Sequence, residues 1–423
     1  MLKIVQNADL SSLNTFRMKV RCAALVEISS EEDLLQADFA SLPQPLMVMG
    51  GGSNLLFRGD FPGTVLHVGI KGVEERDFGQ GHLSQARVST TLEMTKRVHE
   101  APSLSSRPSE APSLSSRPSE ARGEISPGDA VYFRVGAGEV FDEFCEFAAA
   151  KGLWGPENLS LIPGEVGASA VQNIGAYGVE AKDIIHSIRA WDTVEKRFVD
   201  ILGADCAYGY RASNFKTVWK GRYIITYVTY RLWTTPHPVL DYGGLRKSLG
   251  VAAPSEPAAS SVSSVTSSAP FVTSSAPFVT SSEVEKSLTP GLLRDTIIGI
   301  RRKKLPDPEE TGSAGSFFCN PVISREHFAR IVETARQDNG PEYEVPHYEV
   351  GDMIKVPAAW MIEQCGFKGQ RLGGAQVYQN QPLVIVNASG DATPDEIIGL
   401  ENKIIDTIRT KYGVTLHPEV EHI

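Results

Sequence analysis

The sequence has few cysteines, no long apolar run and no excess of basic residues. Its five cysteines, at positions 22, 145, 206, 319 and 365, are odd in number and form no CxxC pair, which argues against a disulfide framework and a zinc site. No apolar run approaches the roughly 20 residues of a membrane helix, and the N-terminal segment lacks the apolar stretch of a signal peptide. We therefore expect a cytoplasmic protein with no membrane insertion and no bound metal.

Acidic residues outnumber basic ones. The chain contains 51 Asp and Glu against 41 Lys and Arg, a formal net charge of −10. This balance argues against a general basic surface for nucleic acid, so we expect no nucleic-acid partner. With 423 residues, 41% of them hydrophobic, the chain is long enough for two or three domains with sizeable cores.

Two segments break the globular pattern with short exact repeats. APSLSSRPSE occurs at 101–110 and again at 111–120, and VTSSAPF occurs at 265–271 and 272–278. Both segments are rich in Ser, Pro and Ala and hold few large apolar groups to offset the entropy of ordering. We expect low-complexity surface insertions at about 101–127 and 249–289, with a regulatory or partner-binding role as the alternative.

Strand-like and helix-like patterns occur in separate groups along the rest of the chain. Runs that are apolar, β-branched or aromatic predict strands at 45–50, 131–138, 222–233 and 382–388. Apolar residues at helical spacing predict helices at 141–153, 292–304 and 393–413. This segregation favours an α+β fold over one doubly wound sheet.

Two glycine-rich segments point to a bound anion or cofactor. GGGSN at 50–54 follows an apolar run, and its glycines permit positive φ angles, so that backbone N–H groups can face an anion. It has neither GxGxxG nor Walker A spacing, and a plain tight turn explains it equally well. Glycines also recur from 155 to 178, as expected for serial bulges or for a chain wrapped around a flat ligand. Together the two segments favour a dinucleotide cofactor.

Six motifs then occur in a fixed order. They are GGGSN at 50–54, IPGEVGASAVQNIGAYG at 162–178, GYRASNFK at 209–216, KLPDP at 304–308, GSFFCNP at 315–321 and PEV at 418–420. In this order they resemble the UDP-N-acetylenolpyruvoylglucosamine reductase family (MurB), in the subtype with a mobile Tyr loop. The resemblance covers nearly the whole chain outside the two repeat segments.

The resemblance implies a PCMH (vanillyl-alcohol-oxidase)-type FAD-binding domain followed by a smaller α+β substrate-binding domain. The expected division is two FAD-binding subdomains at 1–72 and 73–248, the insertion at 249–289, the substrate domain at 290–416, and a tail at 417–423 that returns to the active site. Non-covalent FAD and NADPH as hydride donor are implied. The cofactor contacts carried over by motif are Gly50, Gly51, Gly52, Ser53, Asn54, Ile162, Gly164, Val166 and Gly167.

The implied reaction reduces UDP-N-acetylglucosamine enolpyruvate to UDP-N-acetylmuramate for peptidoglycan synthesis. Hydride addition to the methylene carbon builds negative charge on the α-carbon and its carboxylate, so a cation or donors must already be in place, and an acid must protonate the α-carbon. The resemblance implies that Arg211 holds the carboxylate, that Ser316 donates the proton and that Glu419 assists it. Alone, these residues read as a surface Arg, a loop Ser and a solvated tail Glu.

Three further residues are implied to bind the substrate. Tyr242 lies in the loop expected to close over the UDP group, Lys304 in KLPDP is the expected diphosphate cation, and Asn320 is a weaker contact. Lys355 is a candidate only by its closeness to the VPAAWMIEQCGFKG stretch. Cys319 departs from the pattern, since some members have Lys there.

Two other functions remain open at this point. Another PCMH-type flavin oxidoreductase, such as an alcohol oxidase, shares the glycine-rich loops but is not expected to share GYRASNFK or GSFFCNP. A non-catalytic UDP-sugar-binding relative is expected to lack Arg211, Ser316 or Glu419, and all three are present. We therefore expect a monomeric flavoenzyme of the resembled family.

Overall fold

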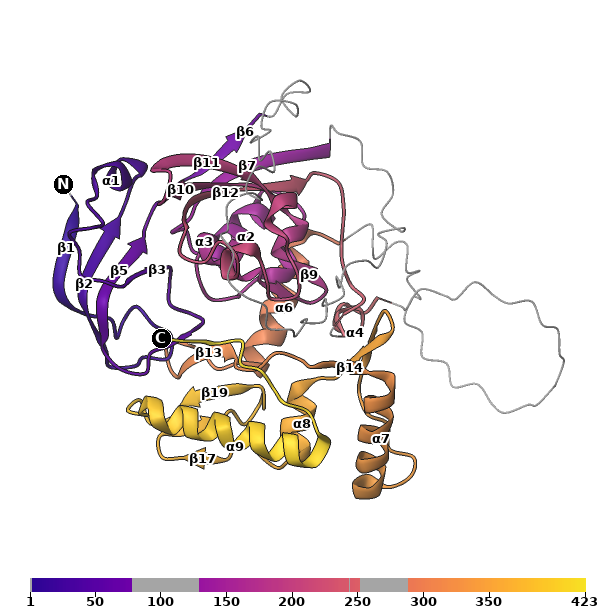
Figure 1. Cartoon of the computed structure of the whole chain (residues 1–423). Coiled ribbons are helices and arrows are strands. Elements are labelled where there is room, and N and C mark those ends of the chain that lie inside the picture. Colours follow the sequence, from indigo (N-terminus) through magenta and orange to yellow (C-terminus); the bar gives the residue numbers. More distant parts are fainter. Residues whose placement is uncertain (1, 78–128, 243, 252–287) are drawn as a thin grey trace, which may run out of the picture.

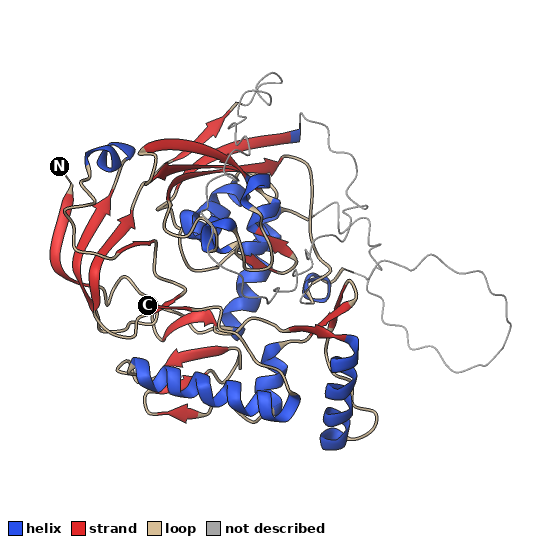
Figure 2. Cartoon of the chain, viewed as in Figure 1, coloured by secondary structure: helices blue, strands red, loops and turns tan. Residues whose placement is uncertain are grey.

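The computed structural model describes residues 2–77, 129–242, 244–251 and 288–423. Figure 1 shows two sheets formed by the first half of the chain and a third layer formed by its C-terminal part, and Figure 2 shows the same view by element type. Both repeats lie outside the described residues. At the edges of the expected 249–289 insertion, Val251 and Leu288 are buried, so packed structure extends into both ends of that segment.

The first sheet has the strand order β1-β2-β5-β3, in which β2, β5 and β3 run parallel and β1 is antiparallel. Successive strand residues point to opposite faces, and β5 accordingly places Val65 in the core shared with the C-terminal layer and Leu66 in the core shared with the second sheet. This sheet therefore separates two cores. Its elements are β1 (Lys3–Asp9), β2 (Arg21–Ile28), α1 (Glu31–Gln36), β3 (Leu46–Met49) and β5 (Phe61–Val68).

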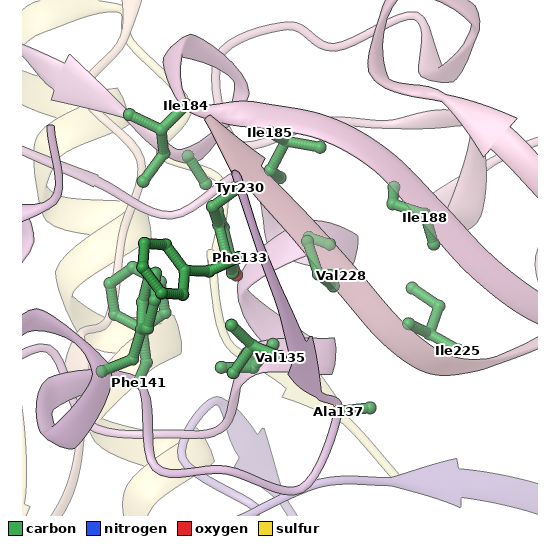
Figure 3. Close-up of a cluster of buried hydrophobic side chains, with 14 of the residues drawn as sticks. Phe133, Val135, Ala137, Phe141, Ile184, Ile185, Ile188, Ile225, Val228 and Tyr230 are labelled. Carbon is green, nitrogen blue, oxygen red and sulfur yellow. The ribbon is translucent and has the colours of Figure 1, made fainter. Parts of the chain in front are cut away.

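The second sheet is antiparallel, with the order β11-β10-β12-β7-β6. Figure 3 shows Phe141 of α2 beside Phe133 and Tyr230 of the sheet, and the ring of Phe144 stacks on Tyr230 with 4.7 Å between centroids. The apolar face of the predicted helix thus covers the sheet. The elements are β6 (Val73–Arg76), β7 (Ala130–Gly136), α2 (Phe141–Ala150), α3 (Val166–Gln172), β10 (Ile185–Asp192), β11 (Arg197–Leu202), β12 (Tyr223–Trp233) and α4 (Leu245–Leu249).

Helix α6 (Pro290–Lys304) packs with the second sheet. Its buried residues Leu293 and Ile297 belong to the same core as Phe144, and Arg294 forms an ion pair with Asp142 of α2. The sequence division at 290 placed this helix in the substrate domain. By packing, α6 is instead the last element of the second unit, although the domain division itself stays a prediction.

The C-terminal layer contains a sheet of order β13-β19-β18-β17, a smaller sheet β14-β16-β15 and three helices. Helix α9 begins with a capping box between Thr393 and Glu396 and ends at Gly413, whose φ is 68°, as its sequence predicts. The bounds are β13 (Gly312–Ser316), β14 (Val322–Ser324), α7 (Arg325–Asn339), β15 (Tyr348–Val350), β16 (Met353–Lys355), α8 (Ala358–Gln364), β17 (Arg371–Leu372), β18 (Ala375–Val377), β19 (Val384–Asn387) and α9 (Pro394–Tyr412).

The tail after α9 returns to the first unit. Strand β20 (Glu421–His422) pairs in parallel with β4 (Leu55–Leu56), directly after the GGGSN segment. Figure 1 shows the C-terminal end beside the loops of the first sheet. The tail therefore connects the C-terminal layer to the first glycine-rich loop. Among the helices described here, none has the length and apolar character needed to cross a membrane.

Candidate active site

A cavity of about 1480 Å³ lies where the three units meet. Its walls come from both glycine-rich segments, the GYR turn, the end of α6, strands β13 and β15, and the C-terminal tail. All the residues predicted for catalysis and substrate binding line it: Arg211, Ser316, Glu419, Tyr242, Lys304 and Asn320. The structure therefore brings together residues that lie more than two hundred positions apart in the sequence.

The two glycine-rich segments face each other across one end of the cavity. Gly164 has a φ of 119°, and a Cβ added there would lie 2.6 Å from Ser53 Oγ. Gly52 has a φ of 60°, and a Cβ there would overlap the Leu13 carbonyl oxygen. Both positions have the positive φ that favours glycine. At Gly52 the Leu13 backbone also leaves no room for a Cβ, whereas at Gly164 the close atom is the Ser53 hydroxyl. The result is a wall of backbone that suits a cofactor carrying phosphates.

The predicted cofactor contacts fall into two groups. Ser53, Asn54, Ile162 and Gly164 line the cavity, whereas Gly50, Gly51, Gly52, Val166 and Gly167 lie behind its surface. The N–H groups of Val166 and Gly167 already donate to the carbonyls of Glu139 and Ala137, at 2.9 and 2.8 Å. Those two amides are engaged in holding α3 against the second sheet. As cofactor contacts, all nine residues stay predictions.

A charged cluster that sequence reasoning missed adjoins this wall. His67 at the end of β5 contacts Glu27 Oε1 through Nδ1 at 3.0 Å and Glu165 Oε1 through Nε2 at 3.4 Å. The Glu165 contact, aided by Glu27 and opposed by burial, raises the pKa of His67 to about 9. Glu165 lines the cavity, and its buried Oε2 accepts no hydrogen bond from any residue that the structure describes. Only the fold brings these three residues together.

Arg211 and Glu419 form the charged part of the cavity wall. Arg211 has a φ of 55°, and its guanidinium donates to the carbonyls of Gly175 at 2.7 Å and Asn173 at 3.4 Å. Its Nε lies 3.0 Å from Glu419 Oε1 in an ion pair, and within the described part of the chain this buried Nε has no hydrogen-bond partner. The carboxylate accepts instead from Gln172 Nε2 at 3.2 Å. The cation is thus fixed mainly by backbone carbonyls.

Ser316 ends β13 on the same wall. It follows Gly315, whose φ of 70° bends the strand, and it pairs with Val384. The next residue, Phe317, accepts a hydrogen bond at its carbonyl from Glu419 N at 2.8 Å, and Asn54 Nδ2 donates to Glu419 O at 3.0 Å. The tail therefore runs between the first glycine-rich loop and Ser316, and the role of Glu419 stays a prediction.

Comparisons with known proteins agree with this geometry. Residues 122–196 match the family model of an FAD binding domain, and residues 307–423 match the model described as UDP-N-acetylenolpyruvoylglucosamine reductase, C-terminal domain. The UDP-N-acetylenolpyruvoylglucosamine reductase of Bacteroides fragilis is 36% identical over 99% of both chains, that of Porphyromonas gingivalis is 36% identical over 100% of both, and that of Neisseria gonorrhoeae is 34% identical over 99% of this chain and 97% of its own. The chain belongs to the UDP-N-acetylenolpyruvoylglucosamine reductase family.

The fold has a solved counterpart within this family. The crystal structure of UDP-N-acetylenolpyruvylglucosamine reductase (MurB) from Thermus caldophilus covers 100% of this chain and 98% of its own, with a TM-score of 0.54 and 17% sequence identity. The predicted α+β fold with a PCMH-type FAD-binding domain is therefore confirmed, and the chain is a flavoprotein oxidoreductase. The predicted cofactors FAD and NADPH accord with membership of this family.

The residues predicted to bind substrate also line the cavity. Tyr242 stacks on Tyr348 of β15 with 5.7 Å between ring centroids, and burial, followed by the neighbouring Tyr348, raises its pKa to about 12. Lys304 is exposed at the end of α6. The Asn320 side chain accepts from Ala358 N at 2.9 Å and so caps α8. Asn320 thus has a structural contact besides its predicted one.

Sequence reasoning missed a cation of the cavity, Arg301. This half-buried side chain lines the cavity, and its buried Nε has no hydrogen-bond partner among the described residues; burial lowers its pKa. Its position three residues before Lys304, on the same face of α6, was the available signal. The weak candidate Lys355 does line the cavity, with its ammonium 5.2 Å from the centre of the Tyr210 ring.

Proposed function

We propose that this chain reduces UDP-N-acetylglucosamine enolpyruvate to UDP-N-acetylmuramate, with non-covalent FAD and with NADPH as the hydride donor. The observation that carries the proposal is that Arg211, Ser316 and Glu419 line one cavity together with the two glycine-rich loops. Another PCMH-type flavin oxidoreductase, such as an alcohol oxidase, is not expected to need Arg211, Ser316 and Glu419 together. Full-length similarity to reductases of this family and the presence of Arg211, Ser316 and Glu419 also argue against a non-catalytic UDP-sugar-binding protein.

Arg211 is suited to bind the substrate carboxylate. Two of its nitrogens are held by the carbonyls of Gly175 and Asn173, so the cation is preorganised before charge develops on the α-carbon and carboxylate. A fixed cation stabilises that charge without further reorganisation. FAD, when bound, supplies the hydride that originates from NADPH.

Ser316 is suited to give the proton that the α-carbon needs. A serine hydroxyl is a weak acid, so it needs neighbouring groups that stabilise its loss of a proton. Glu419 and Arg211 line the same cavity, and the hydrogen bond from Glu419 N to Phe317 O holds the tail next to Ser316. We assign proton donation to Ser316 and assistance to Glu419.

Lys304 and Tyr242 are suited to the diphosphate of the substrate. Lys304 supplies a positive charge, and the Tyr242 phenol supplies a hydrogen-bond donor that burial keeps protonated. Asn320 is a weaker contact because its oxygen already accepts from Ala358 N. A cytoplasmic location, a monomeric state and the absence of a nucleic-acid partner stay predictions.

Anaerobic absorbance measurements on the purified protein test the proposal. We expect a yellow protein whose flavin band bleaches on adding NADPH and returns on adding UDP-N-acetylglucosamine enolpyruvate, with UDP-N-acetylmuramate as product. A protein that binds no flavin would contradict the cofactor assignment. A band that bleaches with NADPH but does not return with this substrate would contradict the reaction while leaving the flavin assignment intact.

A further inference from the structure

Lys216 lies just behind the cavity wall. It contacts Arg211 directly and is connected to Glu419 through Gln172. It ends the short 3-10 helix at Asn214–Lys216, and its ammonium donates to Gln172 Oε1 at 2.7 Å and to the carbonyl of Arg211 at 3.3 Å. Lys216 itself is not among the residues that line the cavity. Any effect it has on the reaction must therefore act through the residues that it holds.

The first arm of this contact runs through Gln172 to Glu419. An ammonium group has donors and no acceptor, so the side-chain oxygen of Gln172 must face Lys216. The amide nitrogen then faces Glu419 Oε1, to which it donates at 3.2 Å. A rotated amide would oppose two acceptors at one end and two donors at the other. Lys216 thus fixes the direction in which Gln172 holds the carboxylate.

The second arm runs to the backbone of Arg211. This residue has a left-handed φ of 55°, a conformation that is uncommon for residues with a side chain. The ammonium of Lys216 contacts its carbonyl, while the guanidinium is fixed by Gly175 and Asn173. A single half-buried cation therefore contacts the main chain of Arg211 and, through the Gln172 amide, the side chain of Glu419.

We propose that Lys216 is a positioning residue that sets the relative placement of Arg211 and Glu419, with Gln172 as the connecting group. The inference rests on the proposed function, since it concerns the substrate step assigned to that pair. Burial lowers the pKa of Lys216, and the nearby Glu419 and Glu421 oppose this effect, as expected for a lysine withdrawn from solvent. The proposal requires that substrate reduction depends on Lys216 while NADPH oxidation does not.

Lys220 offers a matched control. It is exposed, four residues further along, and its ammonium pairs with Glu421 in the same C-terminal tail. If Lys216 only tethered the tail, removal of either lysine would have similar consequences. If Lys216 acts through Gln172, Lys220→Met leaves the rates of both half-reactions unchanged.

The experiment compares Lys216→Met, Lys216→Arg, Gln172→Leu, the double variant Lys216→Met/Gln172→Leu, and Lys220→Met in the FAD-loaded protein. Stopped-flow absorbance separates flavin reduction by NADPH from flavin reoxidation by UDP-N-acetylglucosamine enolpyruvate, and thermal melting checks folding. We expect Lys216→Met to slow reoxidation about 10- to 100-fold, as for a lost hydrogen bond to a charged group. Because Lys216 does not contact the substrate, we expect the KM for the substrate to change by no more than about threefold. Lys216→Arg restores part of the rate.

The double variant decides whether Lys216 and Gln172 act as one unit. Residues in one hydrogen-bonded chain are non-additive, so we expect the double variant to be no slower than the slower single variant. Multiplied effects, equal slowing of both half-reactions, an unchanged Lys216→Met rate, or the same loss in Lys220→Met would each overturn the proposal. If Lys216→Met does not fold, the same test compares the two half-reaction rates of Gln172→Leu with those of Lys220→Met. Failure of the wild-type protein to reoxidise with the substrate would instead reject the proposed function.

Discussion

The two walls of the cavity are built in different ways. The glycine wall, formed by the two segments 50–54 and 162–167 with Ser53, Asn54, Ile162 and Gly164 at the cavity surface, depends on residues without side chains, because a Cβ at Gly52 would overlap the Leu13 carbonyl and one at Gly164 would crowd the Ser53 hydroxyl. The charged wall, formed by Arg211, Ser316 and Glu419, depends on side chains from the second unit, the C-terminal layer and the tail. The first wall is therefore sensitive to added volume and the second to lost polar groups. Changes in the first are expected to affect FAD retention and stability, and changes in the second the half-reaction with the enolpyruvyl substrate.

Ser316→Ala is expected to have the largest effect, and only on the substrate step. It removes the proposed proton donor but no group of the glycine wall. Loss of a general acid typically costs about 10²- to 10⁴-fold in rate, so reoxidation of the flavin by the enolpyruvyl substrate slows by that factor, while bleaching by NADPH stays fast. Stopped-flow absorbance measures both steps.

Ser316→Cys is the matched variant and is expected to recover part of the rate, because a thiol can also donate a proton. Equal slowing of both steps in Ser316→Ala would show that Ser316 shapes the flavin pocket. An unchanged substrate step would place the proton elsewhere, with Glu419 as the next candidate.

Gly52→Ala is expected to damage the other wall. The new Cβ would overlap the Leu13 carbonyl oxygen at a φ of 60°, and strain of both kinds costs about 2–5 kcal/mol. We expect less bound FAD after purification and a lower melting temperature. Gly59→Ala is the control, because a Cβ there meets nothing within 4 Å. Normal flavin content in Gly52→Ala would show that the glycine wall tolerates volume and would remove the contrast between the walls.

Tyr242→Phe is expected to weaken substrate binding and leave NADPH oxidation nearly unchanged. A lost hydrogen bond to a charged group is worth about 1.5–3 kcal/mol, or roughly 10- to 150-fold in affinity. Because the phenyl ring keeps the stack on Tyr348, the effect reports the hydroxyl. Titration of the substrate, monitored by flavin absorbance, measures it. A similar loss for both substrates would contradict a diphosphate contact.

The smallest effect concerns the charged cluster beside the glycine wall. The pKa of His67 is raised from 6.5 to about 9, so its contribution to stability is fully present below pH 6.5 and is lost as pH rises through about 9. We expect a loss on the order of 2 kcal/mol in the free energy of unfolding, measured by urea titration between these pH values. His67→Gln removes this pH dependence; an unaltered dependence in the variant would assign it to other groups.

Sequence motifs pointed to the candidate site residues, but not to the residues that hold them in place. Arg211, Ser316 and Glu419 were identified by motifs because each motif is a short contiguous pattern, and the structure places all three on one cavity. Lys216 lies in the motif of Arg211, and Gln172 lies in the second glycine-rich motif. The hydrogen bond between them joins residues 44 positions apart. The His67 contact with Glu165 spans 98 positions. No local sequence pattern predicts such pairs, because only the packing of distant segments brings the two side chains together.

The sequence by itself determined the local structure. Helical spacing specified α2, spacing together with its caps specified α9, and β-branched and aromatic runs specified β12, since these signals depend on neighbouring residues. Only the tertiary structure decided that α6 packs on α2, because Leu293 and Ile297 are buried in the core of the second sheet. It also decided that the tail pairs with β4. That pairing holds Glu419 near Arg211, because backbone hydrogen bonds join the tail to a segment that is distant in the sequence and that no local pattern specifies.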